Sequence, residues 1–303
     1  MAGQLSAHLG PDIVGPLREI GDLKRVTDAR SPFSLATRLF AEGWSRLSGG
    51  EPVGRIAMNL TARALAAARL GGLDHQFLSA HLPAGVAATD ILRRAIDELA
   101  EPFDADLMSA LKDAVDDVPR SSSPQPTFVA QLAAQPRAGV TCPGKPRIML
   151  QPEENHADHS FVVAVYAALL APTYAADSGE AFFAGMVHHL HSAAMPDSGF
   201  TGEILLGDTL VAVIDSARAA ALAELDPALA DRARTAQAMI ADDRAPAAKA
   251  FHAADVVDRV LEIRFHLEAA SLTMDRVLKS YELVHDGPVK AFHDRVLTEA
   301  GLL

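Results

Sequence analysis

Residues 153–170 read EENHADHSFVVAVYAALL, and this stretch decides the fold of the second half of the chain. Its last ten residues, Phe161 to Leu170, are apolar almost all round, which is typical of a helix that is buried on every side. His156 and His159 stand three residues apart at the entrance of this helix, so they share one of its faces. The stretch therefore places two imidazoles at the edge of a hydrophobic core.

A second group of histidines lies in residues 185–193, GMVHHLHSA, at the end of a helix that we expect over 181–191. His188 and His191 are three residues apart, and His189 is adjacent to His188. Polar groups on mostly apolar helices are costly unless they are paired or coordinated. This placement therefore indicates that the histidines have partners.

A third group lies in residues 249–260, KAFHAADVVDRV, within a long helical region over 248–283. Asp255 and Asp258 are three residues apart, and His252 precedes Asp255 by one turn. Neutral imidazole is a good ligand for divalent transition metals, and a site needs three or four such groups from separate helices. We therefore expect a metal site, and iron, manganese, cobalt, nickel and zinc are all candidates.

The first part of the chain is also expected to be helical. Ala and Leu dominate the composition and aromatic residues make up only 5% of it, which favours helices because aromatic and β-branched side chains lose more freedom there. The periodicity predicts helices over 54–70 and over 88–99, the second opening at an N-cap pair, Thr89 and Asp90. The predicted class is all-α, with Phe40 and Trp44 in the core.

The composition changes after this helical N-terminal region, which covers residues 1–118. Residues 119–152 contain seven prolines. Each proline removes a backbone donor and restricts its neighbour, so the segment cannot form a long helix and is predicted to be a linker. Residues 153–303 are then expected to form a second, metal-binding helical domain.

Charge and hydropathy exclude several classes of function. The formal net charge is −12 and the pI about 5.4, so the chain should repel nucleic-acid backbones. No apolar run is long enough to span a bilayer, and no signal peptide is evident at the N-terminus. A single cysteine, Cys142, suits a reducing compartment. We expect a cytoplasmic protein that binds neither nucleic acid nor membrane.

The three polar groups, in their order, resemble the HD superfamily of metal-dependent enzymes. HSFVVA from His159 is similar to the first motif, AGMVHH ending at His188 and His189 to the His-Asp doublet, and HAADVVDRV with Asp255 to the final aspartate. The resemblance covers residues 153–262. It implies an HD-like helical bundle in the C-terminal half, an additional N-terminal helical region, and a metal held by these four residues.

The sequence departs from the family at one ligand, because His189 replaces the aspartate of the doublet. In binuclear members that aspartate bridges two metals, whereas a neutral imidazole has one free lone pair. His189 can therefore be a terminal ligand but not a bridge, which predicts a single metal ion. His191 and His156 are the candidates for proton transfer, since Ser192 stands where many family phosphatases have an acidic residue. Glu203 and Asp208 are further candidates.

The resemblance implies an enzyme that acts on a small molecule, and three functions compete. The first is a hydrolase of a small phosphorylated metabolite. Residues 153–208 contain no Lys or Arg, so the cations for its phosphate must come from Arg244, Lys249, Arg259 or the N-terminal half. The second is an iron-dependent oxygenase, and the third is a non-catalytic helical regulatory module. The N-terminal half could cover the pocket or form the interface of a homo-oligomer.

Other polar residues have simpler interpretations. Asp258 and Arg259 are expected on a solvated helix face. The histidines outside the three groups are expected to be ordinary surface or capped residues: His8, His75, His81, His266, His285 and His293.

Overall fold

The computed structural model describes residues 9–117, 123–268 and 273–303, which form an all-α fold. Within these ranges no β-strand forms, and isolated bridges such as the one between Val140 and Ile148 are the closest approach to one. The predicted all-α class is therefore confirmed.

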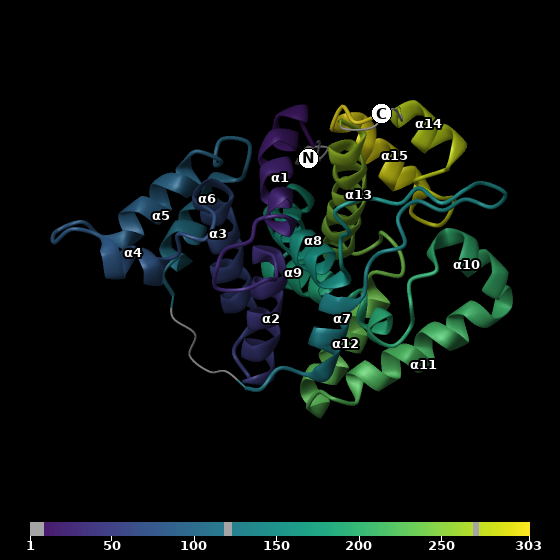
Figure 1. Cartoon of the computed structure of the whole chain (residues 1–303), viewed down its shortest axis with the longest axis horizontal. Helices are drawn as coiled ribbons and strands as arrows, with labels where there is room; N and C mark the ends of the chain where they lie inside the picture. Colours follow the sequence, from purple (N-terminus) through teal and green to yellow (C-terminus); the bar gives the residue numbers. More distant parts are fainter. Residues whose placement is uncertain (1–8, 118–122, 269–272) are drawn as a thin grey trace, which may run out of the picture.

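The α-helices have the bounds α1 (Val14–Gly21), α2 (Leu35–Ser48), α3 (Val53–Leu70), α4 (His75–His81), α5 (Ala88–Asp97), α6 (Ala105–Ala114), α7 (Thr127–Ala134), α8 (His156–Leu170), α9 (Ser178–Val187), α10 (Gly199–Leu206), α11 (Leu210–Leu222), α12 (Pro227–Met239), α13 (Pro246–Glu268), α14 (Met274–Ser280) and α15 (Lys290–Glu299). They are arranged with α4, α5 and α6 on the left of Figure 1, α1, α2, α8, α9 and α13 in the middle, and α10, α11, α14 and α15 on the right. Two short 3₁₀ helices, η2 (Asp22–Lys24) and η4 (Leu190–Ala193), carry residues of the site described below.

Helices α8 and α9 form the centre of the molecule (Figure 1). Every residue of α8 is buried, which confirms the fully buried helix predicted from the apolar run. The two helices meet at Gly185 of α9, where a Cβ atom would lie 2.4 Å from Ala164 Cα and 2.6 Å from the Ala164 nitrogen. Only glycine allows this backbone approach, so Gly185 sets the distance between the helices that carry His159 and His188.

One predicted helix end and one predicted N-cap need correction. The helix expected over 181–191 ends at Val187, because the Gly185 carbonyl accepts a hydrogen bond from the His188 ring and the backbone of His189 leaves the helical region. In α5 the predicted N-cap pair is wrong. The helix already begins at Ala88, and the Thr89 hydroxyl instead donates to Asp116 at 2.8 Å.

The N-terminal helices pack directly on the central pair. Helices α2 and α3 contact α8, and α3 also contacts α9. Phe40 and Trp44 are fully buried as predicted, and Phe128 of α7 packs edge-on against Trp44. The proline-rich segment 119–152 thus contains a short helix that is part of the same core. The division into two helical parts and a linker remains a prediction.

A buried carboxylate joins the N-terminal half to the start of α8. Asp158 accepts hydrogen bonds from the hydroxyls of Ser34 and Thr37, the second at 2.7 Å, and from the Asn155 amide at 2.8 Å. Burial raises the pKa of Asp158 to about 6, and the two hydroxyl hydrogen bonds act against this increase. Ser34, the N-cap of α2, therefore also donates a hydrogen bond to α8, the helix that begins the site.

Helices α10 and α11 extend away from the body at the lower right of Figure 1. None of the residues of α10 is buried, and α11 buries only Ala221 and Leu222 near its end. In the described part of the chain, no helix has the length and apolar character needed to cross a membrane.

The contact at Gly185 yields a first prediction. Gly185→Ala should lower the free energy of unfolding by about 1–3 kcal/mol, because the added methyl group overlaps the α8 backbone and the helices must separate. Urea unfolding measures the change. Gly54→Ala in α3 is the matched control, since its Cβ would meet nothing within 4 Å, and we expect a change of less than about 1 kcal/mol. Equal stability of the two variants would contradict the close packing of Gly185 against the α8 backbone.

Candidate metal centre

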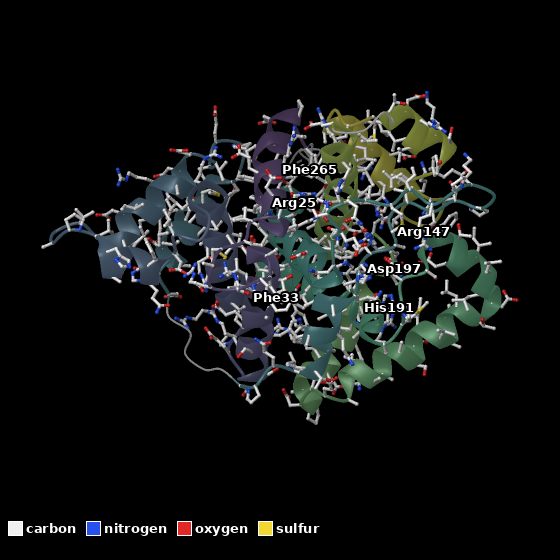
Figure 2. All side chains as sticks on the ribbon, in the orientation of Figure 1. Arg25, Phe33, Arg147, His191, Asp197 and Phe265 are labelled. Carbon is white, nitrogen blue, oxygen red and sulfur yellow. The ribbon has the colours of Figure 1, made fainter. Side chains whose placement is uncertain are left out.

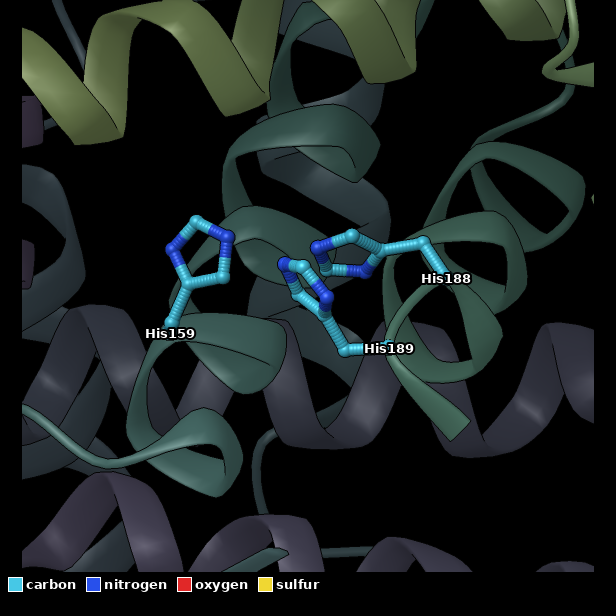
Figure 3. A group of neighbouring side chains, drawn as sticks. All are labelled: His159, His188 and His189. Carbon is cyan, nitrogen blue, oxygen red and sulfur yellow. The ribbon is translucent and has the colours of Figure 1, made fainter. Parts of the chain in front are cut away.

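Three histidines from two helices meet beside α13. His159 lies in the first turn of α8, and His188 and His189 follow the last residue of α9. Each ring offers one ligand atom, and these atoms all lie within 4.8 Å of one another. Figure 3 shows the three rings turned toward a common region. The structure therefore brings together three of the four predicted metal ligands.

The ring of His159 is fully buried and fixed by carboxylates on both sides. Its Nδ1 lies 2.8 Å from Asp258 Oδ2. A carboxylate can only accept a hydrogen bond, and the contact with Asp258 is the shorter of the two carboxylate contacts of this ring, so in the neutral ring Nδ1 carries the proton and Nε2 keeps the lone pair. That Nε2 lies 3.2 Å from Asp255 Oδ1. Neither His159 Nε2 nor Asp255 Oδ1 has a well-formed hydrogen bond within the described residues.

The tautomer of His188 is fixed in the same way. Its Nδ1 lies 2.7 Å from the Gly185 carbonyl oxygen, which is an acceptor, so Nδ1 is again the protonated nitrogen. The His188 Nε2 is buried and has no hydrogen-bond partner in the ranges that the structure describes. Burial is also the main reason why the pKa of His188 lies well below its ordinary value, so the ring is neutral.

The centre therefore presents two imidazole lone pairs, those of His159 and His188, and Asp255 Oδ1 lies 3.2 Å from the first of them. Buried polar atoms of this kind are rarely left without a partner. Metal-bound histidines usually donate their other ring N–H to a carboxylate or a backbone carbonyl, as His159 does to Asp258 and His188 does to Gly185. The donor set fits a divalent transition metal.

His189 differs from the other two histidines because a cation faces it. Arg137 Nη1 lies 3.4 Å from His189 Nε2. A guanidinium can only donate, so this contact uses the Nε2 lone pair and leaves the proton on Nδ1. Metal binding by His189 would require Arg137 to release the ring, and its role as a ligand remains a prediction.

The two residues predicted to transfer protons lie next to His189. The ring centroid of His156 is 4.7 Å and that of His191 is 5.5 Å from the His189 centroid. His156 Nε2 lies 3.5 Å from Asp197 Oδ2. Figure 2 labels His191 and Asp197 on the side of the centre from which α10 projects. Burial lowers the pKa of both histidines to about 4. Asp197 was not identified from the sequence.

Asp258 is not on a solvated helix face, and that prediction is wrong. It is 1% exposed and lies between His159 and the ammonium of Lys24, with Lys24 Nζ 2.7 Å from Asp258 Oδ1. The same Nζ lies 2.5 Å from Glu154 Oε1 and 3.3 Å from Glu262 Oε2. Burial alone would lower the pKa of Lys24, but the three carboxylates raise it well above its ordinary value.

A cavity of about 200 Å³ opens beside the centre, and His189 and Glu154 form part of its wall. Two guanidinium groups line it, those of Arg137 and Arg259. Arg259 Nη2 also lies 3.2 Å from Asp255 Oδ2. Glu203 lines the cavity, whereas Asp208 is exposed on the turn after α10.

Two of the predicted sources of positive charge are therefore present and two are not. Arg259 lines the cavity, and Lys24 reaches the centre from the N-terminal half. Arg244 pairs with Asp242 at the surface, and Lys249 is not among the residues of the cavity wall. Arg137, from the proline-rich segment, was not identified from the sequence.

The remaining histidines divide into exposed and packed residues. His75 and His81 are exposed, as predicted, whereas His8 lies outside the described residues. His266 Nε2 lies 2.9 Å from Glu262, and the ring of His285 stacks on Phe200 with centroids 3.6 Å apart. His293 is 8% exposed, so for this residue the surface interpretation is wrong.

Comparisons with protein-family models, with curated proteins and with solved structures found no match to this chain. The fold and the site define an all-α protein in which histidines and carboxylates lie close enough together to bind a metal ion. The resemblance to the HD superfamily rests on the residues quoted above and remains a prediction.

The buried His293 yields a prediction for the dependence of stability on pH. Burial lowers the pKa of His293 to about 4, against about 6.5 in an unfolded chain. As the pH falls from 7 to 5, the unfolded state therefore takes up a proton that the folded state does not. This residue alone should cost roughly 1–2 kcal/mol of unfolding free energy over that interval.

Urea unfolding with a chelator at pH 7 and pH 5 measures the loss in the wild type and in His293→Gln. We expect a smaller loss in the variant. The same comparison between pH 9 and pH 8, where histidine is neutral in both states, is the control. Identical losses between pH 7 and pH 5 would show that His293 is not held neutral by burial.

Proposed function

We propose that this protein is a hydrolase of a small phosphorylated metabolite that uses a single divalent metal ion. One observation carries the proposal: His159 Nε2, His188 Nε2 and Asp255 Oδ1 lack well-formed hydrogen bonds in the described chain, while hydrogen bonds fix both rings in the tautomer that a metal needs. A metal bound there would lower the pKa of a bound water molecule and polarise a phosphoryl oxygen.

The cations beside the centre support an anionic substrate. Arg137 and Arg259 both line the cavity next to His189, and both also contact the centre, through Glu154 and Asp255 respectively. A planar guanidinium can bind two oxygens of a phosphate at once. We assign the cavity to the substrate and these two side chains to its phosphoryl oxygens.

His156 is the better placed of the two candidates for proton transfer. Burial keeps its ring neutral, so it can accept a proton, and Asp197 beside its Nε2 would stabilise the imidazolium that results. Hydrolysis adds water across the P–O ester bond. His156 would take the proton of the attacking water, and the leaving oxygen would take a proton as that bond breaks.

The first test is the metal content of protein purified without chelators. We expect about one equivalent of a transition metal in the wild type and its loss in His188→Ala and in Asp255→Ala, because each variant removes one donor. Elemental analysis measures it. His252→Ala is the matched control, since this buried histidine lies near Asp255 but its Nε2 faces the Ile240 carbonyl at 3.0 Å.

The identity of the metal then separates the competing functions. Manganese, cobalt, nickel or zinc with hydrolysis of an aryl phosphate would support the proposal. Bound iron with oxygen consumption and no phosphatase activity would favour the oxygenase. Wild-type protein that cannot be loaded with any metal would contradict both enzymes and leave the non-catalytic module.

A second test addresses the phosphate. Arg259→Gln should lower kcat/KM for an aryl phosphate by about 10- to 100-fold, because it removes one or two charge-assisted hydrogen bonds. Arg264→Gln on the same helix is the control, since Arg264 is exposed and does not line this cavity. Equal kcat/KM values in the two variants would exclude Arg259 from substrate binding.

A further inference from the structure

His159 belongs to two different groups of potential metal ligands. One group is His159, His188 and His189, and the other is Glu154, His159 and Asp258. The two groups use opposite edges of the same ring, because Nε2 faces Asp255 at 3.2 Å while Nδ1 faces Asp258 at 2.8 Å. A neutral imidazole has a single lone pair, so it can serve only one of them at a time.

The second group already holds a cation. The ammonium of Lys24 lies 2.5 Å from Glu154 and 2.7 Å from Asp258, and the Lys24 side chain is only 3% exposed. Glu262 completes the surroundings of Lys24 and has a further partner in Arg25, at 2.6 Å. A buried ammonium surrounded by three carboxylates has the same kind of neighbours as a bound metal ion and carries one of the two positive charges of a divalent ion.

Lys24 is linked to His159 through Asp258, whose two oxygens face the ammonium and the His159 Nδ1. Lys24 neutralises Asp258, which can then accept the N–H of His159 Nδ1 without competition from a metal. If the ammonium were absent, Asp258 and Glu154 would be free to bind a metal together with Nδ1. The proton of His159 would then lie on Nε2, where Asp255 Oδ1 could accept it. A cavity of about 10 Å³ beside Lys24, Asp258 and Glu262 adds room for such an ion.

We propose that the ammonium of Lys24 takes the place of a metal ion in the group Glu154–His159–Asp258 and thereby directs the metal to His159 Nε2. Lys24 is thus a positioning residue that acts through Asp258, and it restricts the centre to one ion. The inference rests on the proposed function, because it specifies where the metal of that function binds.

The test asks which residues zinc binding requires, with and without Lys24. Zinc affinity is measured by competition with a chromophoric chelator in the wild type and in Lys24→Ala, each alone and combined with His188→Ala or with Glu154→Gln. In the wild type, we expect His188→Ala to abolish binding and Glu154→Gln to preserve it. In Lys24→Ala the requirement should reverse, so that binding is lost with Glu154→Gln and kept with His188→Ala.

Arg46→Ala is the matched control for loss of a buried cation. Arg46 is 1% exposed and pairs with Glu51 at 2.8 Å in the N-terminal half, so this variant should keep the wild-type requirement for His188. If Lys24→Ala still requires His188, or binds no zinc, the inference is overturned while the proposed function stands. If the wild type itself binds no metal, the proposed function and this inference both fail.

A second measurement does not depend on the folding of Lys24→Ala. Nitrogen-15 NMR of metal-free wild-type protein with labelled histidine reports the tautomer of His159, whose signals are assigned by their loss in His159→Gln. We expect the proton on Nδ1, with Nε2 unprotonated. A ring with its proton on Nε2 would overturn the inference, because the lone pair would then lie on Nδ1, which faces Asp258 and Glu154.

Discussion

The candidate site depends on the close packing of α8 against α9. Because Gly185 has no side chain, its backbone packs directly against Ala164 of α8, where a methyl group would not fit. This contact brings the start of α8 close to the end of α9. The same residue supplies the carbonyl that fixes His188. One small residue therefore determines both the separation of the two candidate metal ligands, His159 and His188, and the tautomer of His188.

Much of the site could be predicted from the sequence because its residues stand on strongly apolar helices. The run Phe161–Leu170 required a buried helix, and a buried helix that begins with His159 places that ring in the core. Asp255 was identified from its spacing and its motif. The ends of helices were less predictable. His188 and His189 leave the helix because of a ring-to-backbone hydrogen bond, and no local pattern signals such a bond.

The residues that the sequence did not reveal reach the centre from distant parts of the chain. Lys24 comes from a 3₁₀ turn in the N-terminal region, and Arg137 comes from the proline-rich segment. Both side chains are charged and stand in polar stretches, where exposure to solvent is the expected state. Asp258 was predicted to be exposed to solvent because it too is a charged residue. The sequence did contain one signal for such residues. The motifs carry several carboxylates but few nearby cations, and buried carboxylates need cationic partners, which must then come from other parts of the chain.

The charges of the centre bear on the proposed combination of one metal ion with an anionic substrate. Lys24 and Arg137 share Glu154, Lys24 neutralises Asp258, and Arg259 pairs with the oxygen of Asp255 that does not face His159. These carboxylates are thus paired with cations before any metal binds, and the other candidate metal donors are imidazoles. A divalent ion in this surrounding would face a cavity lined by two guanidinium groups and by five carboxylates, those of Glu153, Glu154, Asp197, Glu203 and Glu262. An anionic substrate would therefore be held by direct contacts with the metal ion and the two guanidinium groups rather than by the net charge of the wall, and phosphate has the geometry that both a metal and a guanidinium bind.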